Sequence, residues 1–134
     1  MLKFKNKSFR GYVSSRPING NTIPQSLQNL KIRDYAIVKN IEFKLSITEY
    51  RMKNTYYALN SLKTELGKID GVIFFSIYQL PEQKETRKKI VNYFIKKKKS
   101  LFFALEDIEV KSLTEVEEIE LIYFISKNSA KPTN

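Results

Sequence analysis

The chain has 134 residues, 42% of them hydrophobic, which is enough for one folded domain and excludes a disordered protein. It contains no cysteine and no histidine, which excludes disulfides, thiolate nucleophiles, cysteine-rich zinc sites and histidine acid–base catalysis. The net charge of +10 suggests an anionic partner, but most basic residues are lysine, whereas arginine more often reads phosphate and bases. We therefore expect no nucleic-acid partner. No apolar run has the length of a membrane span, so we expect no membrane partner either.

The first part of the chain predicts a strand followed by a helix. Residues 9–13 form the short strand, which ends at the loop "SSRPINGN". Thr22 is the expected N-cap of the helix, with a proline in the first turn. Ile23, Leu27 and Leu30 have the spacing of one helical face, so we expect them to be buried.

The next segment predicts a second strand and helix. Residues 42–47 alternate polar and apolar side chains, which is typical of a half-exposed strand at a sheet edge. The helix that follows carries Leu59, Leu62 and Leu66 and is expected to end at Gly67.

Two continuous apolar runs, "GVIFFSI" and "SLFFAL", predict strands that are buried on both faces of a parallel sheet. A helix after Pro81 is expected to bury Ile90, Val91, Phe94 and Ile95. The last helix is expected to start at a capping box and to bury one stripe of its surface. The box is Ser112 and Glu115, and the stripe is Val116, Ile119, Tyr123 and Ser126.

Four strand–helix units in succession predict an α/β fold, a three-layer sandwich with helices on both faces of a mostly parallel sheet. The two doubly buried strands are the third and fourth, and the alternating second strand belongs at an edge. These features favour the strand order 2-1-3-4, with residues 72–76 in the centre. We expect residues 1–126 to form one domain and residues 127–134 to form a flexible tail.

Polar side chains follow the four strands at their C-terminal ends, which meet at one edge of such a sheet and form its usual ligand site. Arg16 offers a planar fork for a phosphate or carboxylate, and Tyr78 offers a proton or a stacking ring. The candidate catalytic residues are Glu49, Tyr78 and Glu106. The candidate substrate-binding residues are Ser15, Arg16, Asn21, Tyr50, Ser76 and Gln79. Each of them has a purely structural alternative, such as an ion pair between Arg16 and Glu49 or Glu106.

No motif indicates a cofactor or a metal. The four glycines are scattered, and "SSRPING" does not match a dinucleotide-binding loop. The Asp and Glu residues have no spacing typical of a metal site. We expect the site to bind an anionic small molecule, such as a sugar nucleotide, without a cofactor or metal.

The segments "GYVSS" and "QSLQNLKIRDYA" resemble the first strand and first helix of serine recombinase (resolvase) catalytic domains, and "DGVIFFSIYQL" resembles their strand that ends in Lys-Leu-Asp-Arg-Leu. The resemblance implies a resolvase-like fold. The family's arginine two residues before the nucleophilic serine is missing from Val13-Ser14-Ser15. Tyr78-Gln79 stands where the family has Asp-Arg. We therefore expect no DNA strand cleavage or exchange.

A second resemblance covers nearly the whole chain, from about residue 9 to residue 124. "FRGYVSSRPINGNTIPQSLQNLKIRDYA", "SITEYRM", "GVIFFSIYQLP" and "LFFALEDI" together resemble the sporadic carbohydrate cluster proteins of bacterial surface-polysaccharide gene clusters. This resemblance implies a cytoplasmic protein that acts on sugar or nucleotide-sugar intermediates. It implies no particular reaction and no catalytic residues.

Three functions stay open from the sequence. The first is a protein of surface-carbohydrate biosynthesis that binds or modifies an activated sugar, and whether it is an enzyme is undecided. The second is a non-catalytic scaffold for an enzyme of the same cluster. The third is a degenerate resolvase-like nucleic-acid-binding module.

The last helix also predicts a homo-oligomer. Its apolar stripe is wider than one sheet face needs, and a symmetric partner often covers such an excess. The apolar residues are Ile119, Leu121, Ile122, Tyr123, Phe124 and Ile125.

Overall fold

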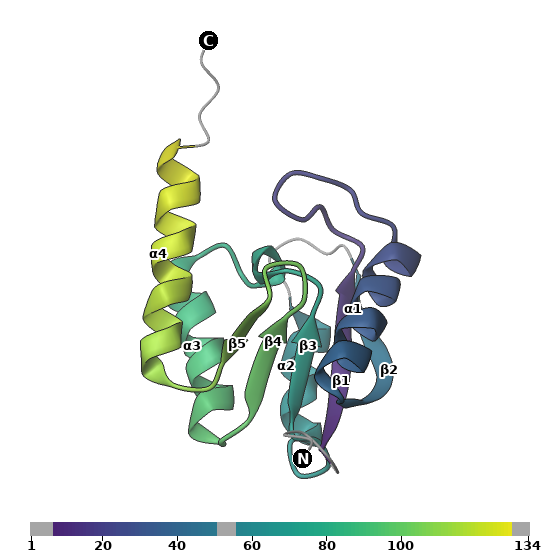
Figure 1. Cartoon of the computed structure of the whole chain (residues 1–134). Helices are drawn as coiled ribbons and strands as arrows, with labels where there is room; N and C mark the ends of the chain where they lie inside the picture. The colour runs from purple at the N-terminus through teal and green to yellow at the C-terminus, as the bar shows by residue number, and fades with distance from the viewer. Residues whose placement is uncertain (1–6, 51–55, 130–134) are drawn as a thin grey trace.

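Five strands form one sheet in the order β2-β1-β3-β4-β5 (Figure 1). The structure is a computed structural model and describes residues 7–50 and 56–129. Neighbouring strands run parallel except β4 and β5, which are antiparallel. The strands are β1 (Ser8–Ser14), β2 (Glu42–Glu49), β3 (Gly71–Phe74), β4 (Ser100–Phe103) and β5 (Ile108–Val110).

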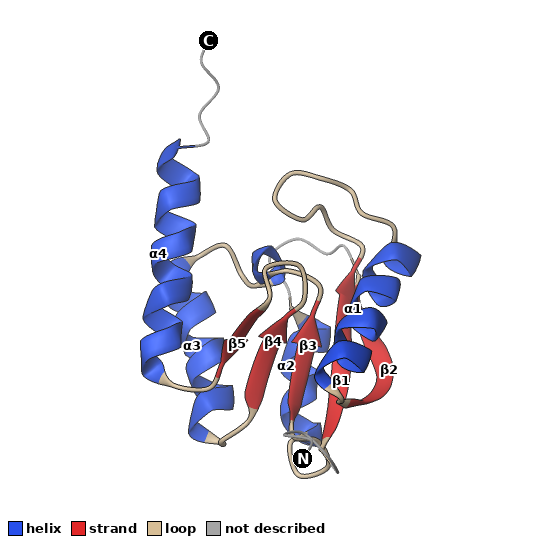
Figure 2. Ribbon diagram, viewed as in Figure 1, coloured by secondary structure: helices blue, strands red, loops and turns tan. Residues whose placement is uncertain are grey.

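Helices cover both faces of the sheet, which confirms the predicted α/β sandwich (Figure 2). Helix α1 packs on one face, and α2, α3 and α4 lie on the other. The helices are α1 (Gln25–Lys39), α2 (Tyr57–Ser61), α3 (Lys84–Lys96) and α4 (Leu113–Ser129), with short 3₁₀ turns η1 (Leu62–Glu65) and η2 (Ile77–Gln79).

The central strand β3 divides the hydrophobic core into two halves, because successive side chains of a strand point to opposite faces. Val72 and Phe74 pack toward α2, α3 and α4. Ile73 and Phe75 pack toward α1. The continuous apolar run of this segment therefore serves both faces, as predicted, and holds the C-terminal end of β3 in a fixed position.

The fold differs from the prediction at β5, which the sequence reasoning did not include. The chain turns back after β4 through Asp107, which has a positive φ of 55°. Three residues then pair antiparallel with β4, so Leu101 lies opposite Val110. A three-residue strand is too short for a periodic signal, which explains the omission.

Two details of helix α1 also differ from the prediction. Pro24, rather than Thr22, occupies the N-cap position, and its side chain makes no capping hydrogen bond. Leu27 and Leu30 are exposed, because the helix turns another face toward the sheet. That face consists of Gln28, Ile32, Tyr35 and Ala36.

Helix α4 continues to Ser129, so the first three residues of the expected tail are helical. Residues 130–134 lie outside the described part of the chain. Within the described part, none of the helices has both the length and the apolar character needed to cross a membrane.

Candidate functional site

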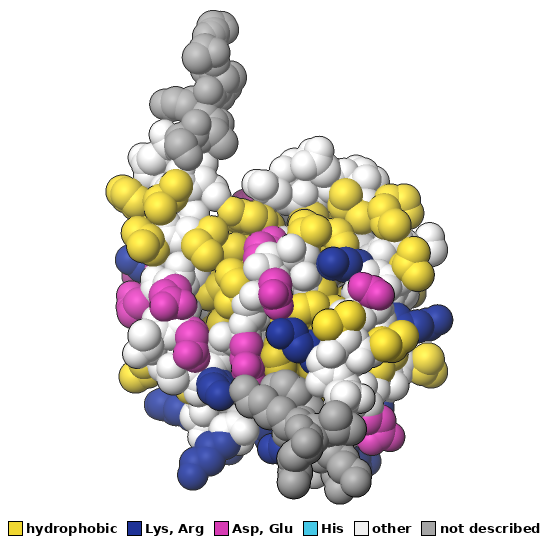
Figure 3. Space-filling model, viewed as in Figure 1, with side chains coloured by type: hydrophobic (Ala, Val, Ile, Leu, Met, Phe, Trp, Pro, Cys, Tyr) yellow, Lys and Arg dark blue, Asp and Glu magenta, His cyan; other side chains and the backbone are white. Residues whose placement is uncertain are grey.

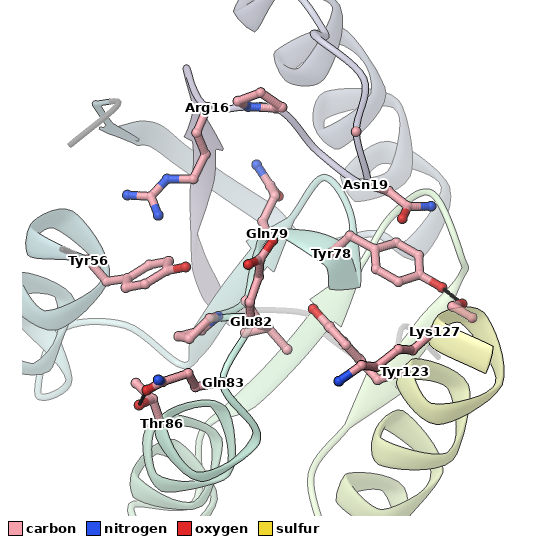
Figure 4. Close-up of a pocket in the computed structure, with 15 residues that line it drawn as sticks. Arg16, Asn19, Tyr56, Tyr78, Gln79, Glu82, Gln83, Thr86, Tyr123 and Lys127 are labelled. Atoms are coloured by element: carbon pink, nitrogen blue, oxygen red, sulfur yellow. Dashed lines mark hydrogen bonds between the residues drawn. The ribbon is translucent and has the colours of Figure 1, made fainter. Parts of the chain in front are cut away.

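A pocket of about 1130 Å³ lies at the C-terminal edge of the sheet (Figure 4). Its walls come from the loop after β1, the segment between β3 and α3, the first turn of α3, the residue before α2, and the C-terminal half of α4. The polar and aromatic residues that line it are Arg16, Asn19, Tyr56, Tyr78, Gln79, Glu82, Gln83, Thr86, Tyr123, Ser126 and Lys127.

A tight turn in the loop after β1 forms one wall. Ile18 and Asn21 exchange backbone hydrogen bonds of 2.7 and 3.0 Å. Between them Asn19 and Gly20 have φ values of 51° and 83°, and these residue types tolerate such angles best. This local chemistry presents Asn19 and Gly20 to the pocket.

Gln79 connects three elements beneath the pocket. Its Oε1 accepts hydrogen bonds from the backbone N–H groups of Phe75 and Ser76, at 2.8 and 3.1 Å. Its Nε2 donates to Ser14 Oγ and to Gln28 Oε1, both at 3.0 Å. All the hydrogen-bonding capacity of the amide is directed inward, so Gln79 shapes the pocket rather than reading a ligand with that group.

Glu106 and Ser76 stabilise the turn that carries Tyr78. Glu106 accepts hydrogen bonds from Ser76 Oγ at 2.6 Å and from the backbone N–H of Ile77 at 3.0 Å. Ser76 is fully buried and caps η2 by accepting from the backbone N–H of Tyr78. Neither residue lines the pocket.

Glu49 has a similar structural role on the other side of β1. It is buried, and it accepts hydrogen bonds from the backbone N–H groups of Ala58 and Leu59, both at 2.9 Å. The Tyr12 hydroxyl donates to the same carboxylate at 2.8 Å. Burial, together with this carboxylate, raises the pKa of Tyr12 far above its ordinary value, so the phenol remains a donor. Glu49 therefore anchors the start of α2.

Two cationic side chains lie on opposite sides of the pocket (Figure 4). The Arg16 guanidinium stacks 4.2 Å from the centre of the Tyr56 ring. This contact places a cation against an aromatic face at the pocket wall. Lys127 lies on α4 next to Ser126, whose hydroxyl is hydrogen-bonded to the Tyr78 hydroxyl.

A buried ion pair holds α3, α4 and the pocket floor together. Arg87 bonds the carboxylate of Glu120 through two nitrogens, at 2.6 and 2.8 Å. Its third nitrogen donates to the carbonyl groups of Pro81 and Glu82. The guanidinium also lies 3.7 Å from the Tyr123 ring centre. Burial raises the pKa of Tyr123, which stays protonated and donates to the carbonyl of Ile77.

The structure brings three of the predicted site residues, Arg16, Tyr78 and Gln79, into the pocket wall. The other six do not line it. Ser15 is hydrogen-bonded to the carbonyl of Glu49, Asn21 belongs to the turn, and Tyr50 is exposed. Glu49, Ser76 and Glu106 satisfy backbone donors instead, as described above.

The sequence reasoning missed the pocket residues that do not follow a strand. Tyr56 precedes α2, and Gln83 and Thr86 belong to the start of α3. Tyr123, Ser126 and Lys127 come from α4, which extends beyond the sheet edge (Figure 1). The sequence does single out two of these residues, since Tyr123 and Ser126 lie on the predicted stripe of the last helix.

The described part of the chain contains no group of three or more Asp and Glu residues placed to hold a metal ion. Glu82 is the one carboxylate among the residues that line the pocket in that part. The pocket chemistry is therefore that of cations, amides, hydroxyls and tyrosine rings.

The comparisons with known proteins show a likeness of fold. No family model matches the chain, and neither does any curated protein. The fold is similar to the crystal structure of the N-terminal catalytic domain of TP901-1 integrase, with a TM-score of 0.65 and 16% identity. The alignment covers 88% of this chain and 94% of that domain. This supports the resolvase-like fold, and nothing in the comparisons supports the resemblance to the carbohydrate cluster proteins.

At the end of β1, the two serines are not placed as exposed nucleophiles. Ser14 is buried, and its Oγ accepts a hydrogen bond from Gln79. Ser15 is half-buried, with its Oγ near the carbonyl of Glu49 at 3.4 Å. The likeness to the integrase domain is one of fold alone.

Proposed function

We propose that the protein binds an anionic small molecule of the sugar-phosphate or nucleotide-sugar class in this pocket. The observation that carries the proposal is that two cationic side chains and three tyrosines line one cavity of about 1130 Å³. They are Arg16, Lys127, Tyr56, Tyr78 and Tyr123. Arginine and lysine suit phosphate groups, and tyrosine rings stack on sugars and bases. The cavity volume is large enough for a ligand with two rings and a diphosphate.

The proposal is binding without a chemical step. Two of the three candidate catalytic residues, Glu49 and Glu106, are occupied by backbone donors and lie outside the pocket wall. The hydroxyl of the third, Tyr78, is hydrogen-bonded to the hydroxyl of Ser126. A general base needs hydrogen-bond reach to the substrate, which neither glutamate has from its observed position.

The test is calorimetric titration of the full chain with UDP-glucose, UDP, glucose 1-phosphate and glucose. We expect at least one of the three phosphate compounds to bind and glucose not to bind. Arg16→Ala should weaken that binding about tenfold, equivalent to about 1.4 kcal/mol. Lys96→Ala is the matched control, because this exposed lysine lies at the end of α3 and away from the pocket. Equal binding by both variants would refute the proposal.

A second candidate is a nucleic-acid-binding module, favoured by the integrase-like fold together with the net charge of +10. Binding of this kind depends on released counterions and weakens steeply with salt. Fluorescence anisotropy with a labelled DNA duplex at 50 and 200 mM NaCl tests it. Tight binding that falls by orders of magnitude between these concentrations would favour this function over the small-molecule site.

A further inference from the structure

The outer face of helix α1 is apolar and exposed. Leu27, Leu30, Ile37 and Val38 are 50%, 63%, 70% and 71% exposed. Their spacing of i, i+3, i+10 and i+11 places them in one stripe along the helix, opposite the residues that pack on the sheet. Figure 3 shows hydrophobic side chains over this part of the surface. Single exposed apolar residues are ordinary, but four in one stripe are typical of an interaction surface.

Charged residues of both signs interrupt the stripe at its middle. Asp34 occupies the i+7 position of the stripe and is exposed. Arg33 and Lys31 flank it, one on each side of the helix. A twofold axis between Arg33 and Asp34 would place Leu30 against the partner's Ile37. The same axis would place Asp34 against the partner's Arg33.

We propose that α1 is the interface of a homodimer in which two copies of α1 pack antiparallel. The apolar stripe supplies the buried surface, and each Asp34–Arg33 contact occurs twice because the arrangement is symmetric. One helix of 15 residues is about 22 Å long and covers less area than a standard interface. We therefore expect a weak, reversible dimer.

Two alternatives are less consistent with the structure: a membrane on this stripe, and an interface on α4 instead. An anionic membrane surface would attract Lys31 and Arg33 but would repel Asp34 in the centre of the stripe. The exposed apolar residues of α4, the face expected from the sequence, adjoin pocket residues, since Phe124 and Ile125 lie between Tyr123 and Ser126 in the chain. A partner on α4 would compete for space with the entrance to the pocket.

Sedimentation of the full chain from 1 to 500 µM tests the proposal, with far-UV circular dichroism as a check of folding. We expect reversible dimerisation of the unmodified protein. Asp34→Arg should weaken it about tenfold, because two attractive pairs become repulsive. The double change Arg33→Asp with Asp34→Arg should restore dimerisation, since it rebuilds both pairs with reversed signs. A residue with only an intrachain role would not show this rescue.

The matched control is Glu118→Arg, an equivalent charge reversal at an exposed position of α4. It should leave dimerisation unchanged. A monomer at all concentrations, a failure of the double change to rescue, or a loss caused by Glu118→Arg would each overturn the proposal. Binding of the monomer to vesicles that contain phosphatidylglycerol, without dimerisation, would also overturn it. Arg16→Ala should not affect the dimer, so this test is independent of the proposed ligand site.

Discussion

Replacement of Gln79 by alanine tests whether the amide network beneath the pocket organises the site. The change removes the acceptor for the N–H groups of Phe75 and Ser76 and the donor to Ser14 and Gln28. All of these groups are buried. Because the Gln79 amide makes four hydrogen bonds to these groups, we expect polar satisfaction to dominate the effect.

The expected loss of stability follows from the two orphaned backbone donors. Each buried donor without a partner costs about 1–3 kcal/mol, so the two N–H groups together cost at most about 2–6 kcal/mol. Water that enters from the adjacent pocket will satisfy part of this, and we expect a net loss of about 3 kcal/mol. Gln79→Glu, with its carboxyl protonated at this buried site, keeps an acceptor for both N–H groups and one of the two donors, so it should cost about half as much.

Urea unfolding followed by far-UV circular dichroism measures these changes. At an m-value of about 2 kcal/mol/M, the alanine variant should lower the midpoint by about 1.5 M. Gln83→Ala is the matched control, since Gln83 is exposed and should change the midpoint little. A loss below about 1 kcal/mol for Gln79→Ala would show that water replaces the amide without cost. Equal losses for the alanine and glutamate variants would show that acceptance from the backbone is not the main contribution.

Three further predictions concern other parts of the molecule. Hydrogen bonds from the backbone of residue 111 and from Ser112 hold the pKa of Glu115 below its ordinary value, so its stabilising effect should disappear as the pH falls below about 4.5. Glu115→Gln should therefore flatten the acid limb of a stability–pH curve. Arg87→Ala should lower the free energy of unfolding by about 3–5 kcal/mol, because it leaves the Glu120 carboxylate buried without its partner. Incubation with supercoiled or nicked DNA should give no covalent phosphoserine link, a result that mass spectrometry of Ser14 and Ser15 peptides checks.

The sequence was sufficient for the α/β class and for the order of the first four strands because the strong signals are collective. The apolar run around Ile73 and Phe74 places β3 in the centre, and the alternation from Glu42 onward places β2 at the edge, as the structure confirms. Once both assignments are made, right-handed crossovers leave little choice of strand order. The location of the pocket followed as well, because the C-terminal ends of parallel strands must share one edge of the sheet.

The tertiary structure decided the roles of individual polar side chains. Glu49, Glu106 and Arg16 all follow strand ends, and nothing in their spacing distinguishes a ligand contact from a partner for the backbone. Glu49 and Glu106 lie where α2 and η2 begin, and the first N–H groups of a helical turn have no partner inside the turn. The two carboxylates satisfy these donors and are withdrawn from the pocket, whereas Arg16 faces it.

The tertiary structure also decided which face of α1 is buried. The sequence alone favours Leu27 and Leu30 as its inner face because they are the apolar residues with helical spacing. In the folded protein, Gln28 points inward because it donates to the carbonyls of Ser14 and Ile23 and accepts from the Ser14 N–H, groups that become buried only when β1 packs against the helix. The need to satisfy these buried backbone groups exists only in the assembled structure, so hydrophobic periodicity cannot reveal it.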